Sequence, residues 1–402
     1  MSTQQAHIPP AHPAYILRGH AAPVHATRFV RANARLLTAD ADGWVVLWGT
    51  ATRRAVAVWR AHQGAVLGLG ELGAENFVTH GRDSHLCVWH LPLADESSFS
   101  TVLPVDDASA PRKQPWLLHS LTVNTLNFCA FAMLAAPGPT PTSNTAATDT
   151  ATDIGVNARQ EAVLAVPSVR DEQIDVLHLP SERRTSIVPR LGFKTGMIMA
   201  LALSRPQASP SGPLCLVSAY ESGHIALHVL DATSGSSWTR LYVAQPHAQP
   251  PLSVCVLPAA EMEAAEASAP KPKSKSATKT LSTKHAGQQG LTARSDGRLL
   301  ATAGWDGRVR VYAARSLREL AVLKWHKEGC YAVCFAEVGG AGADAGSVAQ
   351  GGGVGGGGDV LITREAGTAT TTVRRRREDK ARSVHWLAAG SKDGKVSLWE
   401  IY

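Results

Sequence analysis

The sequence predicts an all-β fold in which one small sheet is repeated along 402 residues. The first observation is a six-residue step from a turn residue to a residue, usually aromatic, that closes the next strand. The copies are Asp42 and Trp48, Asp83 and Trp89, Glu172 and His178, Ser222 and His228, Asp306 and Tyr312, and Asp393 and Trp399. The second observation is a hydroxyl residue four places before the turn residue. Five copies have it, as Thr38, Thr79, Ser168, Ser218 and Thr302, and the sixth has Ala389 instead.

Each copy has the pattern of two strands joined by a tight turn. In the first copy, the apolar run from Leu36 is followed by Asp42-Gly43 and then by a second apolar run that ends at Trp48. Asp-Gly between apolar runs favours a hairpin, because glycine tolerates positive φ and the aspartate side chain bonds to nearby backbone. The repeat therefore predicts that each turn residue joins the second and third strands of a four-stranded blade.

A histidine precedes the first strand of most copies. These residues are His20, His62, His119, His247 and His326, and Phe193 stands in this place in the fourth copy. A buried His, Thr, Asp and Trp can bond in sequence and tie the strands of one blade together, with about 1 kcal/mol net for each bond. We therefore expect these histidines to be structural, together with their partner acids Asp42, Asp83, Asp306 and Asp393.

The Gly19-His20 pair and the closing tryptophans resemble the WD40 family of β-propellers. This resemblance implies a closed ring of blades, with residues 1–402 forming one domain. The copies predict six blades. Seven is common in the family, and a seventh could lie in 91–115, but this stretch has no hydroxyl–acid–aromatic triplet. The chain ends in the third strand of the last copy, so Ala14–Leu17 is expected to supply the missing fourth strand and close the ring.

Four polar or low-complexity stretches interrupt the repeat and are predicted to be disordered loops. They are 91–115, 137–157, 258–289 and 339–382. The first is predicted to lie between the third and fourth strands of a blade, and the others between the first and second strands. All four would then leave from the end of the propeller opposite the His and Asp turns. We predict that the uncluttered turn end is the docking surface.

The composition limits the class of protein. No apolar run approaches the roughly 20 residues of a membrane helix, and the N-terminus lacks the pattern of a secretory signal. The six cysteines are scattered without a Cys-x-x-Cys pair, which favours reduced thiols in an intracellular protein. The net charge of +7 comes partly from Lys271 to Lys275 and from Arg374 to Arg377. Both basic runs fit either solvated loops or nuclear import. Direct nucleic-acid binding is not expected, because no aromatic residues are interleaved with these charges.

The sequence predicts a binding protein rather than an enzyme. A Thr79, His62 and Asp83 trio could be chosen as a catalytic site, but the same trio recurs in other copies, whereas an active site is usually unique. Nucleophile-elbow, zinc-protease and phosphate-loop motifs are missing, so no cofactor, metal or small-molecule substrate is predicted. The residues before the turn acids, Arg82, Trp305 and Lys392, are the candidate partner-binding side chains. Trp305 could bind a partner or pack on a neighbouring blade.

The match narrows to the fungal ASTRA-associated protein 1 family. The similar segments run from Ile16 to His20, Arg35 to Trp48, Val78 to Trp89, Leu179 to Arg184 and Ala389 to Trp399. The resemblance implies a nuclear subunit of the ASTRA assembly, which is linked to chromatin remodelling and to maturation of phosphatidylinositol-3-kinase-related kinases. It also implies ASTRA subunits and Tel2-type and Tti-type co-chaperones as partners, and no catalytic residues.

Two other scaffold classes are the alternatives. A substrate receptor of a cullin ubiquitin ligase would often carry Trp-Asp-x-Arg at a blade end, but the residues after Trp48 and Trp89 are Gly49 and His90. A G-protein β-like signalling scaffold would need an N-terminal helix, and the first thirteen residues contain three prolines.

Overall fold

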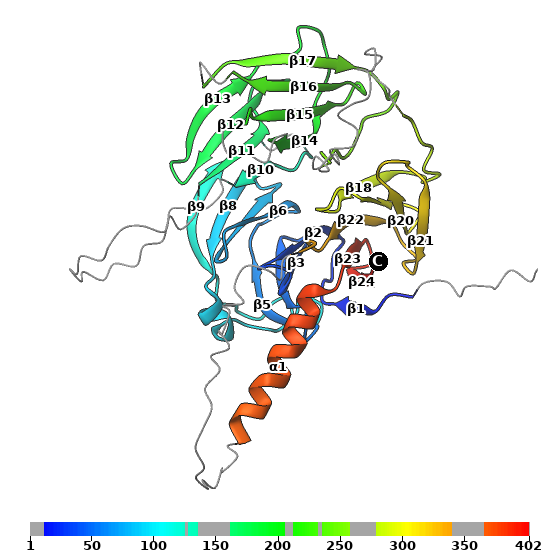
Figure 1. Cartoon of the computed structure of the whole chain (residues 1–402). Coiled ribbons are helices and arrows are strands. Elements are labelled where there is room, and N and C mark those ends of the chain that lie inside the picture. Colours follow the sequence, from blue (N-terminus) through cyan, green and yellow to red (C-terminus); the bar gives the residue numbers. More distant parts are fainter. Residues whose placement is uncertain are drawn as a thin grey trace, which may run out of the picture.

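In the computed structural model, the chain forms six four-stranded antiparallel sheets arranged around a centre (Figure 1). The structure describes residues 12–124, 128–135, 161–205, 212–231, 235–257, 279–339 and 366–401. The prediction of a six-bladed β-propeller is confirmed. We number the blades 1 to 6 in chain order from β2, and in each blade the strands follow one another outward from the centre.

Neighbouring strands of a blade are consecutive in the chain, except in blade 6. Blades 1 and 2 contain β2 (Val24–Val30), β3 (Arg35–Asp40), β4 (Trp44–Gly49), β5 (Arg54–Arg60), β6 (Val66–Leu72), β7 (Asn76–Gly81), β8 (His85–His90) and β9 (Trp116–Thr122). Blades 3 and 4 contain β10 (Ala132–Ala135), β11 (Ala162–Pro167), β12 (Ile174–Leu179), β13 (Arg183–Val188), β14 (Ile198–Ser204), β15 (Cys215–Tyr220), β16 (Ile225–Leu230) and β17 (Trp238–Ala244). Blade 5 contains β18 (Gln288–Ala293), β19 (Leu299–Gly304), β20 (Arg308–Ala313) and β21 (Glu319–Lys324), and blade 6 contains β22 (Cys330–Phe335), β23 (Trp386–Ser391), β24 (Lys395–Glu400) and β1 (Tyr15–Arg18).

Blade 6 closes the ring with strands from both ends of the chain. β1 pairs antiparallel with β24, with Tyr15 opposite Leu398 and Arg18 opposite Lys395. The Ala14 N–H donates to the Leu398 carbonyl at 2.8 Å, and Leu17 is buried. The predicted pairing of Ala14–Leu17 with the last strand is therefore confirmed. It satisfies the edge of β24, which would otherwise be an open template for association.

The hydrophobic core lies between the blades, where the faces of neighbouring sheets pack on each other. Each buried cluster spans two adjacent blades: blades 6 and 1, 1 and 2, 2 and 3, 3 and 4, and 5 and 6. Trp59, for example, extends from β5 into the cluster shared with blade 2 and is fully buried. The alternation of inward and outward residues along each strand sends apolar side chains to both of these interfaces.

The structure corrects the start of blades 3 and 5. His119 does not precede a blade, because it lies in β9, where its Nδ1 is 2.5 Å from Glu182. Likewise, His247 precedes no strand of blade 5, which begins at β18 after His285. The stretch 258–289 therefore joins two blades, rather than the first and second strands of one blade. In its described part, Lys279 donates to the Ser316 carbonyl between β20 and β21, at the end of the propeller opposite the His and Asp turns.

Two of the predicted disordered loops contain regular structure. Residues 91–115 include a 3-10 helix, η1 (Leu93–Ser98), and 339–382 includes most of α1 (Ala366–Ser383). Figure 1 shows α1 projecting from the propeller. Arg375, Arg376 and Arg377 belong to this helix and are exposed. Buried Ala381 and the 2.9 Å bond from Trp386 Nε1 to its carbonyl fix the C-terminal turn of α1 to blade 6. The stretch 137–157 and most of 258–289 lie outside the described residues.

Candidate interaction surface

A buried polar network holds the turn end of blade 1. Trp48 Nε1 donates to Thr38 Oγ1 at 2.8 Å, and the Thr38 hydroxyl lies 2.7 Å from His20 Nε2. On the other side of the ring, His20 Nδ1 lies 2.7 Å from Asp40. The predicted acid, Asp42, is the wrong one. Asp40 also accepts from the backbone N–H groups of the turn, so it fixes both the histidine and the hairpin.

In blades 2 and 5 the acid is the predicted turn residue. His62 joins Thr79 to Asp83 at 2.7 and 2.9 Å, and His285 joins Thr302 to Asp306 at 2.9 and 2.8 Å. The position of Asp40 in blade 1 is occupied by Gly81 in blade 2 and by Gly304 in blade 5. A Cβ at Gly81 would come within 2.3 Å of His62 Nδ1, and one at Gly304 within 2.0 Å of His285 Nδ1. The glycine therefore leaves room for an acid two residues further on.

In blade 6 the hydroxyl of the polar network comes from a different strand than in the other blades. Ala389 has no hydroxyl, but Ser397 lies directly opposite it on β24. Trp399 Nε1 donates to Ser397 Oγ at 2.9 Å, and His326 Nε2 lies 2.8 Å from the same hydroxyl. Ser397 thus replaces the missing threonine, although the six-residue repeat did not mark it. The His326 to Asp393 distance of 3.7 Å is too long for a hydrogen bond.

The three candidate partner-binding residues lie in turns that adjoin the loops between blades. Their backbone N–H groups each donate to such a loop: Arg82 to Ala65, Trp305 to Gly287 and Lys392 to Gly329. Because these loops and turns share one end of the propeller, the three side chains lie on the same end. All three are exposed, which their use as binding residues requires.

Trp305 is anchored on one side and open on the other. Its indole Nε1 donates to Gln289 Oε1 at 3.1 Å, and a Cβ at Gly287 would come within 2.2 Å of the ring. Half of the residue remains exposed. Lys392 lies on the next blade, where its Nζ is 3.8 Å from Glu328. The indole thus packs on the first strand of its own blade and still presents an exposed face, and its role in partner binding remains a prediction.

Arg82 lies near the mouth of the central channel. Its guanidinium stacks 4.4 Å from the ring centre of Phe128, which is itself exposed. Phe128, His25, Tyr331 and Gln289 line the channel, a cavity of about 270 Å³ formed by the inner strands. Burial lowers the pKa of His25, and the charge of Arg82 lowers it further against the opposing effect of Asp40. The turn end therefore combines cationic and aromatic side chains around a narrow opening, a combination that is enriched in protein interfaces.

The buried histidines and thiols of the described residues serve the fold. Burial lowers the pKa of His62 and of His285, although Asp83 and Asp306 act in the opposite direction. Burial also raises the pKa of Cys255 to about 11 and of Cys330 to about 12, so both thiols stay protonated. No group of three His, Cys, Asp or Glu residues in the described ranges could hold a metal ion. Among the same residues, no helix combines the length and hydrophobicity of a membrane span.

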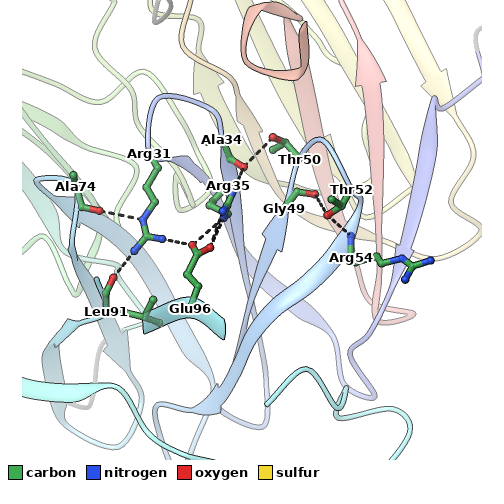
Figure 2. Close-up of polar contacts among 10 residues, drawn as sticks. All are labelled: Arg31, Ala34, Arg35, Gly49, Thr50, Thr52, Arg54, Ala74, Leu91 and Glu96. Atoms are coloured by element: carbon green, nitrogen blue, oxygen red, sulfur yellow. Dashed lines mark hydrogen bonds and ion pairs between the residues drawn. The ribbon is translucent and has the colours of Figure 1, made fainter. Parts of the chain in front are cut away.

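A second hollow lies at the opposite end, where blade 1 meets η1 and the end of α1. It is a cavity of about 440 Å³, lined by residues that include Arg31, Arg35, Glu96 and Arg382. Figure 2 shows the Glu96 carboxylate between the guanidinium groups of Arg31 and Arg35. Arg35 holds it through two bonds, Nε to Oε1 at 2.9 Å and Nη2 to Oε2 at 2.6 Å. The Glu96 carboxylate thus bonds both guanidinium groups and forms a structural joint at one side of the hollow.

Glu96→Gln is expected to destabilise the protein by about 3 kcal/mol, because an amide N–H would then face two buried guanidinium donors. Glu96 is one of two adjacent acids, Asp95 and Glu96, in a polar stretch, so no sequence pattern marked this joint. Urea unfolding followed by tryptophan fluorescence measures the change. The matched control is Glu182→Gln, whose half-exposed carboxylate contacts His119 and whose loss should cost under about 1 kcal/mol. Equal effects of the two substitutions would contradict a buried joint at Glu96.

Comparison with known proteins identifies the family. The model of the WD domain, G-beta repeat, matches residues 11–49, 278–313 and 372–400. ASTRA-associated protein 1 of Aspergillus flavus is 44% identical over 100% of both chains, and that of Verticillium alfalfae is 44% identical over 97% of this chain and 93% of its own. The solved structure of the computationally designed Ika8 protein covers 96% of this chain and 98% of its own, with a TM-score of 0.47 and 14% identity. The full-length identity to these fungal relatives shows that the chain belongs to the ASTRA-associated protein 1 family of WD40-repeat proteins.

Proposed function

We propose that this protein is a nuclear subunit of the ASTRA complex, acting without catalysis as a scaffold in chromatin remodelling and in maturation of phosphatidylinositol-3-kinase-related kinases. The WD40 propeller and the family support the coarser role, a protein-interaction scaffold. The observation that carries the proposal is the identity of 44% over the whole chain to a relative named ASTRA-associated protein 1. The matched region covers the whole chain and therefore includes every blade.

The proposed partners are the other ASTRA subunits and co-chaperones of the Tel2 and Tti types. The turn end supports binding of proteins, since exposed aromatic side chains lie there beside cations. The basic runs fit a nuclear location, and Arg375 to Arg377 are exposed on α1, where an import receptor could reach them. A small-molecule substrate is not part of the proposal.

Affinity purification of the tagged full chain from its own cells, followed by mass spectrometry, tests this function. Recovery of Tel2-type and Tti-type proteins in amounts comparable to the bait is the expected result. Recovery of a cullin adaptor in their place would favour a ubiquitin-ligase receptor, and recovery of G-protein γ-like subunits would favour a signalling scaffold. Either outcome would overturn the proposal.

Trp305→Ala is expected to reduce recovery of at least one of these partners about tenfold or more, because a half-exposed aromatic anchor is a typical binding hot spot. The variant should keep the melting temperature of the parent within a few degrees, since one face of the indole is already in solvent. Trp116→Ala on β9 is the matched control, an exposed tryptophan on the outer strand of blade 2. Unchanged recovery with Trp305→Ala would show that Trp305 only packs on its neighbour.

A further inference from the structure

A groove lies where the ring closes, between the outermost strands of two neighbouring blades, β1 of blade 6 and β5 of blade 1. It has a volume of about 610 Å³, and all four residues of β1 line it together with the start of β5. The remaining lining comes from Trp48 and from Thr101 and Leu103, which follow η1. We call this place the closure groove. At the usual rise of a strand, β1 is about 13 Å long, so the groove can hold a short extended segment.

The side of the closure groove that follows η1 is fixed by hydrogen bonds. The Val58 N–H on β5 donates to the Ser100 carbonyl at 2.9 Å. The Arg112 guanidinium donates to the Val102 carbonyl through Nε and Nη2, at 3.1 and 3.0 Å. Leu103 packs against the buried cluster between blades 6 and 1. The groove is therefore formed before any ligand arrives, which lowers the cost of binding.

The closure groove is basic. Its lining includes Arg18, Arg53 and Arg54, and none of its described residues is Asp or Glu. Within the described ranges, none of these three arginines forms an ion pair. Like charges along one groove repel one another, and an anion bound between them offsets this cost. The described part of the chain thus gathers three cations here and supplies no acid for them.

Arg53 and Arg54 are placed to bond a carboxylate. The Arg53 guanidinium lies over the Tyr15 ring, 5.1 Å from its centre. Stacking uses the flat face of a guanidinium and leaves its N–H edges free for a carboxylate. Arg54 is exposed, and Figure 2 shows its side chain extending away from the hydrogen-bonded residues around Glu96. Both guanidinium groups are therefore available to a ligand in the groove.

Apolar side chains share the closure groove with these cations. Tyr15 is 41% exposed, and Ile16, Ala55 and Leu103 are half-buried. Apolar surface of this kind is left in water until a ligand covers it. A ligand that suits the groove therefore carries both carboxylates and apolar groups. A nucleic acid suits it less, because most of its hydrogen bonds to proteins come from phosphates and sugars.

We propose that the closure groove binds an extended acidic segment of a partner protein, with carboxylates on the three arginines and an apolar side chain against Tyr15 and Leu103. Arg53 lies beside Tyr15 at the start of β1, and Arg18 ends this strand. These two cations are therefore roughly 10 Å apart along the strand, which matches acids about three residues apart in an extended segment. The inference rests on the proposed scaffold role and adds to it a second surface, with the chemistry of the segment that binds there.

The test uses the tagged full chain in its own cells, with photo-reactive benzoylphenylalanine in place of Tyr15, which keeps an aromatic ring under Arg53. The expected cross-link joins position 15 to a partner peptide that has acids about three residues apart. Separately, Arg54→Glu should reduce recovery of that partner about tenfold or more, because a carboxylate then faces the acids of the segment. The melting temperature should stay within a few degrees of the parent, since Arg54 is exposed.

Arg318→Glu is the matched control for Arg54→Glu. By strand register, Arg318 has the same position in blade 5 that Arg54 has in blade 1, and it is also exposed. The N–H of each arginine donates to a hydroxyl two residues earlier in its turn. Arg318 does not line the closure groove, so its reversal should change recovery less than about twofold.

Arg18→Glu is a second variant, at the other end of β1. Arg18 lies opposite Lys395 on β24, so a glutamate there adds no like-charge repulsion to the strand pair. It should reduce recovery of the same partner by a similar factor. If Arg54→Glu does not fold, this variant decides the result.

Several outcomes would overturn the inference. Unchanged recovery with Arg54→Glu and Arg18→Glu would show that no acidic segment binds there. Cross-links to the same chain or to a second copy would make the groove a self-contact, and cross-links that a nuclease removes would make it a nucleic-acid surface. Recovery of Tel2-type proteins that does not depend on either arginine would remove only this inference. An acidic partner cross-linked at position 15, without any ASTRA subunit, would instead remove the proposed function and keep the groove.

Discussion

Deletion of residues 1–19 is expected to destabilise the whole propeller by at least about 4 kcal/mol, because it removes β1 from blade 6. The loss combines the backbone hydrogen bonds of the β1–β24 pair with the burial of Leu17 in the cluster between blades 6 and 1. It also exposes the edge of β24, so aggregation on heating should increase. Urea unfolding and light scattering measure both effects.

Two point substitutions in β1 test whether the loss of stability comes from its role in closing the ring. Leu17→Ala should cost about 2–5 kcal/mol, because it leaves a cavity in a well-packed cluster. Tyr15→Ala, at an exposed position of the same strand, should cost less than about 1 kcal/mol. A soluble deletion variant with an unchanged melting temperature would show that the ring does not depend on this strand.

Mild acid is expected to unfold the protein, with the steepest loss of stability between about pH 6.5 and pH 4. Burial lowers the pKa of His80, His228 and His326 to about 4 in the folded protein. In the unfolded chain these groups titrate near 6.5. Between these values the unfolded state binds protons that the folded state does not, so stability is complete above pH 6.5 and falls as the pH decreases.

The expected size of the acid effect is large. Each of the three histidines should contribute about 3 kcal/mol over this window, and the slope near pH 5 should approach about 4 kcal/mol for each pH unit. Asp83, Asp306 and Asp393 have lowered pKa values, since hydrogen bonds and cations near them outweigh burial, so they add to the loss at still lower pH. Urea unfolding at a series of pH values gives the slope directly.

His80→Leu isolates one of these contributions. His80 is buried in β7 beside Phe131, and neither of its ring nitrogens has a hydrogen-bond partner within the described ranges. The substitution removes one titrating group of similar size and should reduce the slope near pH 5 by about 1.4 kcal/mol per pH unit. His90→Leu serves as the control, because its partly exposed ring carries no comparable burial. An unchanged slope with His80→Leu would mean that His80 is already protonated in the fold.

Local features of the fold could be predicted from the sequence. The Asp83 to Trp89 step marked a hairpin because turn chemistry and alternation act over a few residues. The pairing of the two chain ends could also be predicted, because one strand was missing at the end and an unassigned apolar strand stood at the start. The turn location of Arg82, Trp305 and Lys392 followed from the same hairpins, and their role in binding remains a prediction.

Several network partners could not be assigned without the coordinates, although one had a signal. His285 precedes Thr302 by seventeen residues, the spacing of His62 and Thr79, so spacing alone could have found it. Ser397 had no such signal, because its role depends on lying across the sheet from Ala389. Asp40 rather than Asp42 bonds His20 Nδ1, and this depends on the conformation of the folded turn, which brings the Asp40 carboxylate next to that nitrogen.

The sequence by itself determined the repeated hairpins, their number and the closing strand, because these follow from residues close in the chain and from the rule that strands must be paired. Only the tertiary structure decided how blades meet. Glu96 bonds Arg31 and Arg35, which precede it by some sixty residues. Among the described residues no buried hydrophobic cluster spans blades 4 and 5, although the strands of blade 4 look like the others. The physical reason is that hydrogen-bonded turns are local, whereas burial of a face is set by whatever the rest of the chain brings against it.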